Sequence, residues 1–260
     1  MKKVSIIVPA YNEEKRIGHT LELYSPYFEF LNKIGEIDYE ILIVINNTTD
    51  RTLEIVKSYA KKNKNIRYLD LTKGGKGYAV IEGFKDALKR DNNLIGFVDA
   101  DCSTKPEAFY DLIVKISKYD GVIASRYLKK SIVEPKQTLA RIVVSRIFNA
   151  YIRALLMMPY RDTQCGAKLF KRNALERTLR KLTMSKWAFD VDLIYSMRKE
   201  GLHVEEIPTK WSDKTHAKIN FMRAGPWMAL GILRLRLLNS PFKSMTRIYD
   251  KMLNRVWKLR

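Results

Sequence analysis

LIGFVDADCST, residues 94–104, is the stretch from which the architecture of this chain can be worked out. An apolar run typical of a buried strand ends in two aspartates one residue apart, Asp99 and Asp101. Neighbouring carboxylates at the end of a buried strand are costly unless a cation or a hydrogen-bond donor meets them. The chain as a whole carries a formal net charge of +20, so this local concentration of acid indicates a site. We expect the pair to hold a divalent metal and, through it, a diphosphate.

Short apolar runs alternate with segments of helical character on both sides of this stretch. Runs typical of buried strands occupy residues 4–8, 39–45, 66–71, 94–100 and 121–125. Helical segments are expected at about residues 13–30 and at residues 49–62, 78–90 and 105–117. Thr49 and Asp50 are candidate caps, and Pro106 suits a first helical turn. The alternation favours an α/β fold with a mostly parallel sheet, whose ligands sit at the carboxyl ends of the strands.

Composition narrows the class of protein. Hydrophobic residues make up 46% of the 260, which is enough for a substantial core. The 48 lysines and arginines against 28 acidic residues predict an anionic partner: nucleic acid, an anionic membrane surface or a phosphorylated substrate. Cys102 and Cys165 have no metal-ligand or disulfide spacing, which favours a reducing cytosolic setting. The uncharged run at residues 224–233 is about half of the roughly 20 residues that cross a bilayer, so no transmembrane helix is expected.

A polar motif follows each predicted strand. In chain order these motifs are PAYNEE, NNTTD, KGGKGYA, DADCST and ASRY. Hard carboxylate oxygens at Asp99 and Asp101 suit Mg²⁺ or Mn²⁺, and Lys76 is a point charge for phosphate. Each motif alone is more often an ordinary turn or cap, but their order and spacing together indicate a site for a metal-bound diphosphate.

Several segments resemble the family 2 glycosyltransferases of the GT-A fold. They are VSIIVPAYNEE at residues 4–14, the Asp-Ala-Asp motif, RDTQCGAKLFKR at residues 161–172 and the segment at residues 187–213 that begins WAFDVD. The likeness covers residues 4–213, and it implies a GT-A domain, Rossmann-like with a mostly parallel sheet flanked by helices, at residues 1–215. Within the family, DTQCG followed by W-x-F-D is similar to dolichyl-phosphate glucosyltransferases and other polyprenyl-phosphate glycosyltransferases.

The resemblance implies roles for matching positions. The residues expected to bind the nucleotide sugar are Pro9, Tyr11, Glu13, Asn46, Lys76, Asp99, Asp101 and Gln164. Cys165 and Gly166 are expected to line the sugar pocket with Gln164. Asp101 binds the metal, Mg²⁺ or Mn²⁺, directly, with Asp99 beside it. The acceptor phosphate is assigned to Arg126, Arg141 and Ser145.

Two further carboxylates are candidates for the chemistry, and three positions depart from the family pattern. Asp190 and Asp192, with Asp101, are the catalytic candidates, because their segment supplies the general base in relatives with hydroxyl acceptors. Asn46 stands where the family usually has aspartate, which leaves the base of the nucleotide open. Asn47 replaces a glycine, which a left-handed turn tolerates. Ala124 stands where the usual family text, GSR, has glycine, two residues before Arg126.

The end of the chain is strongly basic. Residues 209–260 hold 12 lysines and arginines against 2 aspartates. On a helix, residues 245–260 would place apolar side chains on one arc with basic side chains beside it, as in helices that lie on anionic membranes. We therefore expect residues 216–260 to form basic amphipathic helices that associate with a membrane. Packing on the core or in a dimer is the alternative.

These features predict an inverting glycosyltransferase. It would move a hexose, expected to be glucose from UDP-glucose, to dolichyl or another polyprenyl phosphate as a peripheral protein at the cytosolic membrane face. One alternative is a family 2 enzyme with a saccharide or lipid hydroxyl acceptor. A second is a basic nucleic-acid-binding protein, although no recognition module is visible and no specific nucleic acid is expected. A third is a catalytically inactive family member, in view of Asn46; the oligomeric state stays open.

Overall fold

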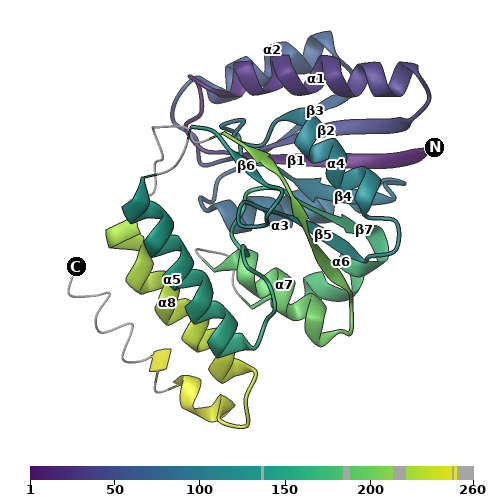
Figure 1. The fold of residues 1–260 in the computed structure, drawn as a ribbon. Helices are drawn as coiled ribbons and strands as arrows, with labels where there is room; N and C mark the ends of the chain where they lie inside the picture. The colour runs from purple at the N-terminus through teal and green to yellow at the C-terminus, as the bar shows by residue number, and fades with distance from the viewer. Residues whose placement is uncertain (136–137, 184–187, 213–220, 248, 251–260) are drawn as a thin grey trace.

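The computed structural model describes residues 1–260 except 136–137, 184–187, 213–220, 248 and 251–260. A seven-stranded sheet with the strand order β3-β2-β1-β4-β7-β5-β8 forms its centre, and β6 and β9 form a small second sheet (Figure 1). In chain order the elements are β1 (Lys2–Ala10), α1 (Ile17–Lys33), β2 (Ile37–Asn46), α2 (Thr52–Lys62), β3 (Ile66–Leu71), α3 (Lys76–Ala87), β4 (Leu94–Phe97), α4 (Pro106–Lys115), β5 (Gly121–Ser125), β6 (Ile132–Val133), α5 (Leu139–Leu156), β7 (Lys168–Lys171), α6 (Arg172–Thr178), the 3₁₀ turn η1 (Leu179–Lys181), α7 (Phe189–Lys199), β8 (Val204–Pro208), β9 (Lys210–Trp211), α8 (Phe221–Leu238) and the 3₁₀ turn η2 (Lys243–Met245).

The α/β class expected from the sequence is confirmed. The main sheet is parallel except for β7, which runs antiparallel to both β4 and β5. Strand β7 lies so close to β4 that a Cβ atom added to Gly96 would come within 2.4 Å of the Lys168 carbonyl oxygen. The glycine in the middle of β4 is therefore what admits the antiparallel strand.

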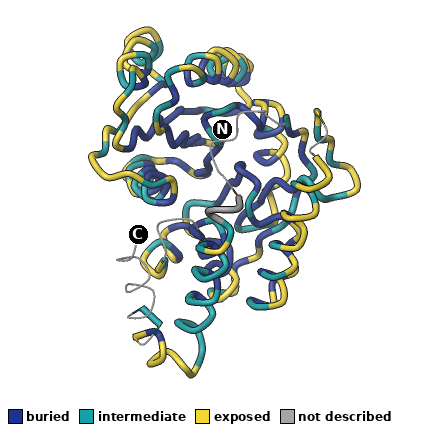
Figure 2. Tube along the Cα trace, turned by 90° about the vertical axis from the view of Figure 1, so that its left-hand side faces the viewer, coloured by how far each residue is buried: buried dark blue, intermediate teal, exposed yellow. Residues whose placement is uncertain are grey.

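Strand β1 lies inside the sheet between β2 and β4, and its residues 4–10 are all buried. Successive side chains of a strand point to opposite faces. Ile6 and Val8 belong to a cluster with residues of α1, α2 and α4, whereas Ile7 belongs to a second cluster with residues of α3 and α5–α8. Figure 2 shows the buried strands enclosed between helices whose outward faces are exposed. Burial on both faces explains why this strand is a continuous apolar run.

The C-terminal part packs against α5. Tyr151 on α5 donates a hydrogen bond of 3.0 Å to the Ala229 carbonyl on α8, and Ile232 of α8 belongs to the second core cluster. The chain after η2 returns to α8, where Arg234 pairs with Asp250 at 2.7 Å. The helix expected at residues 245–260 lies mostly outside the described residues. None of the helices in the described part of the chain is long and apolar enough to cross a bilayer.

Candidate active site

The aspartate loop, residues 99–104, leaves the sheet after β4 and is held by helix α1. The hydroxyl of Thr20 donates a hydrogen bond of 2.7 Å to the carbonyl of Ala100. The hydroxyl of Tyr24 donates another of 2.7 Å to the carbonyl of Thr104. Both side chains are buried, so α1 positions the loop through two main-chain oxygens that water does not reach.

Asp99 pairs with Lys76, the first residue of α3, at a distance of 2.5 Å between Oδ1 and Nζ. Burial and the neighbouring Asp101 raise the pKa of Asp99, although Lys76 opposes the shift. Burial acts to lower the pKa of Lys76, but Asp99 and Asp190 raise it well above its ordinary value. Gly166 packs directly on the Asp99 carboxylate, because a Cβ atom there would lie 2.0 Å from Oδ2. The site thus combines a fixed carboxylate, a charged ammonium and a glycine that makes room for them.

Asp101 supplies the second carboxylate, and its Oδ1 accepts a hydrogen bond of 2.9 Å from the Ser103 backbone N–H. No cluster of three or more His, Cys, Asp or Glu side chains suited to a metal occurs in the described residues. Mg²⁺ is commonly held by only one or two carboxylates together with substrate phosphates. Asp99 and Asp101 therefore fit a divalent metal whose remaining ligands a diphosphate provides.

A second ammonium group, that of Lys168, is fully buried beside the site. Its Nζ donates hydrogen bonds of 2.7 Å to Asp190 Oδ1 and 2.6 Å to the Cys165 carbonyl. The Nζ atoms of Lys76 and Lys168 lie 5.9 and 5.2 Å from the centroid of the Phe97 ring. Buried charges persist when they are paired, so Lys168 holds Asp190 at the site.

Asp192, two residues further along α7, faces the other way around the helix. Its fully buried carboxylate accepts a hydrogen bond of 2.7 Å from the Thr183 backbone N–H and one of 3.0 Å from Ser196 Oγ. These contacts tie α7 to the segment before it. The structure does not bring Asp192 together with Asp190.

The residues expected around the nucleotide gather where β1 ends. Pro9 is buried in the strand, whereas Tyr11 just beyond it is 49% exposed. Glu13 forms a bidentate ion pair with Arg16, with N···O distances of 2.6 and 2.8 Å. Burial opposes the shift, but Glu13 and Asp101 raise the pKa of Arg16. Arg16 therefore belongs to the electrostatic surroundings of the aspartates.

Asn46 is buried at the end of β2, and both polar atoms of its side-chain amide are used. Nδ2 donates a hydrogen bond of 3.0 Å to the Ala10 carbonyl, and Oδ1 accepts one of 3.2 Å from the Gly75 N–H. An ionised aspartate could keep the second of these hydrogen bonds but not the first, because a carboxylate only accepts. Gly75 has a φ of 128°, which favours glycine, and it directly precedes Lys76. Asn46 thus ties the ends of β1 and β2 to the turn that carries Lys76.

The next residue, Asn47, adopts the left-handed conformation with φ 52° that its sequence position predicts.

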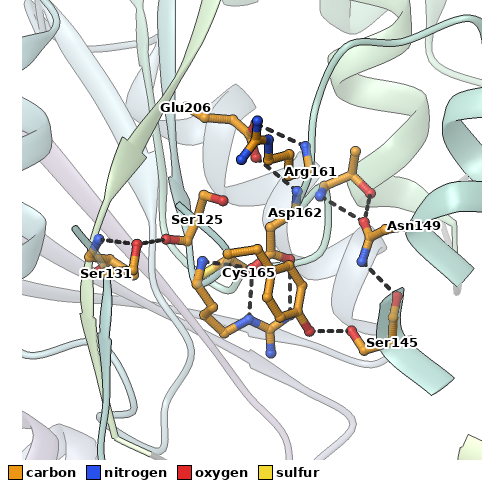
Figure 3. Close-up of polar contacts among 12 residues, drawn as sticks. Ser125, Ser131, Ser145, Asn149, Arg161, Asp162, Cys165 and Glu206 are labelled. Carbon is orange, nitrogen blue, oxygen red and sulfur yellow. Dashed lines mark hydrogen bonds and ion pairs between the residues drawn. The ribbon is translucent and has the colours of Figure 1, made fainter. Parts of the chain in front are cut away.

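The DTQCG loop, residues 162–166, is held by side chains of two neighbouring elements (Figure 3). The Glu206 carboxylate on β8 accepts hydrogen bonds of 2.8 Å from the backbone N–H groups of Asp162 and of the residue before it. Asn149 on α5 accepts a hydrogen bond of 3.2 Å from the Thr163 N–H. These anchors fix the loop that presents Gly166 to Asp99.

Asp162 itself is fully buried and forms a bidentate ion pair with Arg126, with distances of 2.7 and 2.9 Å. Burial favours a higher pKa for Asp162, but Arg126 outweighs it and holds the pKa below its ordinary value. Burial, with the added effect of Asp162, raises the pKa of the Cys165 thiol to about 12, so Cys165 acts as a small apolar residue rather than a nucleophile. Gln164 is half-buried and makes no side-chain hydrogen bond within the described residues.

Two aromatic side chains bring together the residues predicted to bind the acceptor phosphate. The guanidinium groups of Arg126 and Arg141 lie 5.2 and 6.0 Å from the centroid of the Trp211 ring. The hydroxyl of Tyr127 donates a hydrogen bond of 2.6 Å to Ser145 Oγ. Arg126, Arg141 and Ser145 therefore surround one place, where β5 ends and α5 begins.

Three charged residues of this region were not singled out from the sequence. Arg146 adds a guanidinium 5.7 Å from the centroid of the Tyr127 ring, and Arg16 and Lys168 are described above. Only Lys168 has a signal in the sequence: it is a lysine within the apolar run A-K-L-F of a predicted core, where a buried charge requires a partner. Arg16 follows a polar stretch and Arg146 is one of three arginines in a helical segment, and neither context by itself predicts a site.

A mostly parallel sheet with paired aspartates after its central strand defines the GT-A class of glycosyltransferases, and comparison with known proteins agrees. Residues 5–179 match the family described as "Glycosyl transferase family 2". This chain belongs to the family 2 glycosyltransferases.

Several curated relatives share one name. A dolichyl-phosphate beta-glucosyltransferase of Dictyostelium discoideum is 32% identical over 246 residues, which is 90% of this chain and 73% of the relative. The proteins of that name from Drosophila melanogaster and Homo sapiens are 30% and 29% identical; the alignments span 88% and 93% of this chain and 72% and 78% of theirs.

Among solved structures, glucosyl-3-phosphoglycerate synthase from Mycobacterium tuberculosis, in complex with Mn²⁺, UDP and phosphoglyceric acid, has a TM-score of 0.65. It is 15% identical, and the superposition covers 92% of this chain and 78% of that one. At this identity the likeness shows the fold.

Proposed function

We propose that this chain transfers glucose from UDP-glucose to dolichyl phosphate or another polyprenyl phosphate, with inversion at the sugar. The observation that carries the proposal is the position of the DTQCG loop between two charged sites. Gly166, at one end of the loop, packs on Asp99, and Asp162, at the other, pairs with Arg126. One rigid loop thus joins a site suited to a metal-bound diphosphate with a site suited to a second anion.

The chemistry follows from these charges. An anionic oxygen of the lipid phosphate attacks C1 of the sugar, the new C1–O bond forms, and the bond from C1 to the nucleoside diphosphate breaks with its electron pair on the leaving group. No proton has to be removed from the acceptor. Lys76 places positive charge where the diphosphate leaves, and Arg126, Arg141 and Ser145 would hold the attacking phosphate. A divalent metal bound by Asp99 and Asp101 would supply further charge stabilisation for the leaving group.

A hydroxyl acceptor would instead need a general base. Both candidates are engaged by neighbouring groups: Asp190 accepts a hydrogen bond from Lys168, and Asp192 is buried among donors of Thr183 and Ser196. This engagement favours the phosphate acceptor. We do not retain the nucleic-acid alternative, because the chain belongs to a glycosyltransferase family.

Relatives support the donor and the cofactor, whereas the location rests on the basic segment expected from the sequence. The names of the curated relatives favour a glucosyl donor and dolichyl phosphate, and structures of the mycobacterial synthase hold UDP with Mn²⁺ or Mg²⁺. We therefore propose a Mg²⁺- or Mn²⁺-dependent enzyme acting peripherally at the cytosolic membrane face.

The acceptor tests the proposal. Purified protein is incubated with Mg²⁺ or Mn²⁺, labelled UDP- and GDP-hexoses, and vesicles containing either a polyprenyl phosphate or the matched polyprenol. We expect label from UDP-glucose to enter the lipid phosphate alone. Label entering only the polyprenol would overturn the phosphate acceptor in favour of a hydroxyl acceptor, and label from GDP-sugars alone would overturn the donor.

A further inference from the structure

Helix α5 presents two different faces. Its inner face is buried and includes Ser145, Asn149, Ile152 and Leu156. The opposite face is exposed and mostly apolar; it includes Leu139, Val143, Ile147, Ala150 and Ala154, and Met157, the residue that caps the helix, continues it. Their spacing of three or four residues places them in one stripe along the helix. We call these six residues the α5 stripe.

The α5 stripe is unusual for a surface that faces water. Leu139, Ile147 and Met157 are 80%, 65% and 66% exposed, and they span the whole helix. Contiguous exposed apolar surface of this kind marks a place of interaction. Figure 1 shows α5 and α8 side by side at the margin of the molecule, so the stripe is presented outward from the sheet.

The charges beside the stripe indicate what it contacts. Arg146 and Arg153 are exposed next to it, and α5 contains no aspartate or glutamate. An apolar stripe bordered by arginines is typical of a helix that lies in an anionic bilayer interface, where lipid phosphates meet the cations and acyl chains meet the apolar side chains. A second copy of the same face would bring arginines against arginines with no acid from either helix.

The inner side of the same helix connects this surface to the chemistry. Arg141 and Ser145, on the first and second turns, face the proposed acceptor-phosphate site. We propose that the α5 stripe is the surface on which the chain lies on an anionic bilayer, so that a lipid acceptor reaches Arg141 and Ser145 at the height of the headgroups. This inference rests on the proposed lipid-phosphate acceptor. It assigns membrane docking to a helix that precedes, in the chain, the segment at residues 216–260 that was expected from the sequence to associate with a membrane.

Vesicle flotation of the full chain tests the proposal, with phosphatidylglycerol–phosphatidylcholine vesicles and no substrate. Val143→Glu with Ile147→Glu puts two carboxylates on the stripe. The matched control is Ile34→Glu with Val114→Glu, since these residues are similarly exposed, at 54% and 52%, but lie at the end of α1 and on α4. We expect the fraction of protein that floats with the vesicles to be at least tenfold lower for the stripe variant than for wild type. The control should float to the same extent as wild type, and both variants should keep the thermal melting temperature of wild type.

Two further readouts keep docking and function apart. Equal flotation of the stripe variant and wild type would overturn the docking surface, even if the enzyme transfers glucose to a short water-soluble polyprenyl phosphate. Sedimentation could also show that wild type is a dimer and the stripe variant a monomer. That result would overturn membrane docking and indicate that a second copy of the chain covers the α5 stripe. Loss of flotation in the stripe variant alone supports docking whether or not transfer is detected, because flotation needs no donor.

Discussion

At the scale of single residues, one glycine sets the geometry around Asp99 in the proposed donor site. A Cβ atom on Gly166 would lie 2.0 Å from Asp99 Oδ2, so Gly166→Ala must displace the carboxylate or the DTQCG loop. A misplacement of about 1 Å costs roughly a hundredfold in rate, and we expect transfer to fall by at least that factor. The matched control is Gly225→Ala on α8, where nothing lies within 4 Å of the added atom. Steady-state rates that are equal for both variants would contradict the contact.

Asn46 is the clearest departure from the family pattern, and its hydrogen bonds predict how it acts. Asn46→Asp restores the family residue but cannot donate to the Ala10 carbonyl. Because the amide holds Gly75 and thereby Lys76, we expect nucleotide affinity to fall about tenfold, by the same factor for UDP and GDP. Calorimetric titration with both nucleotides checks this. A variant that gains affinity for one base and loses it for the other would identify Asn46 as a reader of the base instead.

The sequence identifies the residues of this site better than their partners. Asp99, Asp101 and Lys76 could be placed because each follows a predicted strand, and parallel strands end at one edge. Lys168 and Asp190 are 22 residues apart, and only the folded chain shows that they pair. The same holds for Asp162, which the motif DTQCG contains but whose partner, Arg126, lies 36 residues away.

Helix α1 supports the active site at the scale of elements. Tyr24→Phe removes the buried hydrogen bond to the Thr104 carbonyl without creating a large cavity. We expect the free energy of unfolding to fall by about 1–3 kcal/mol, because the carbonyl is left without that partner. Denaturant titration measures the change. Tyr68→Phe, on the exposed side of β3, is the control and should leave the free energy of unfolding unaltered; an equal loss in both variants would count against the role of α1.

The elements of the first half, up to β5, were largely predictable. Strands β3 and β5 lie at residues 66–71 and 121–125, as expected, because short apolar runs between polar loops mark them. Helix α4 begins at Pro106, as expected. Helix α2 begins at Thr52, after the candidate caps Thr49 and Asp50, because Asp50 accepts a hydrogen bond from the Thr52 N–H. Strand β7 was not expected, since the alternation of strands and helices carries no information about a strand that enters the sheet in the opposite direction.

The Arg126–Asp162 ion pair joins the two sites at the scale of the whole molecule. Asp162→Asn removes the charge that compensates a nearly buried guanidinium, and we expect a loss of about 3–5 kcal/mol in the free energy of unfolding at pH 7. The pKa of Asp162 is lowered by folding, so its stabilisation is present above the ordinary value of 3.8 and disappears as the pH falls through the folded value.

The difference in stability between wild type and Asp162→Asn should therefore shrink below about pH 4. Thermal melts of both proteins at a series of pH values will measure it. Asp111→Asn, which removes an exposed carboxylate of α4, is the control and should show no such pH-dependent difference. A stability difference between wild type and Asp162→Asn that stays constant down to low pH would contradict the ion pair.

The most direct test of a metal-assisted glycosyl transfer is the rate at which labelled glucose moves from UDP-glucose into a polyprenyl phosphate, compared between wild type and Asp101→Asn at saturating Mg²⁺ or Mn²⁺. Asp101→Asn keeps the shape of the side chain and its contact with the Ser103 N–H, but it removes the charge that the metal and diphosphate require. We predict labelled lipid from wild type and at least a hundredfold lower rate from the variant. Equal rates from the two proteins, or no labelled lipid from wild type with any nucleotide sugar, would contradict it.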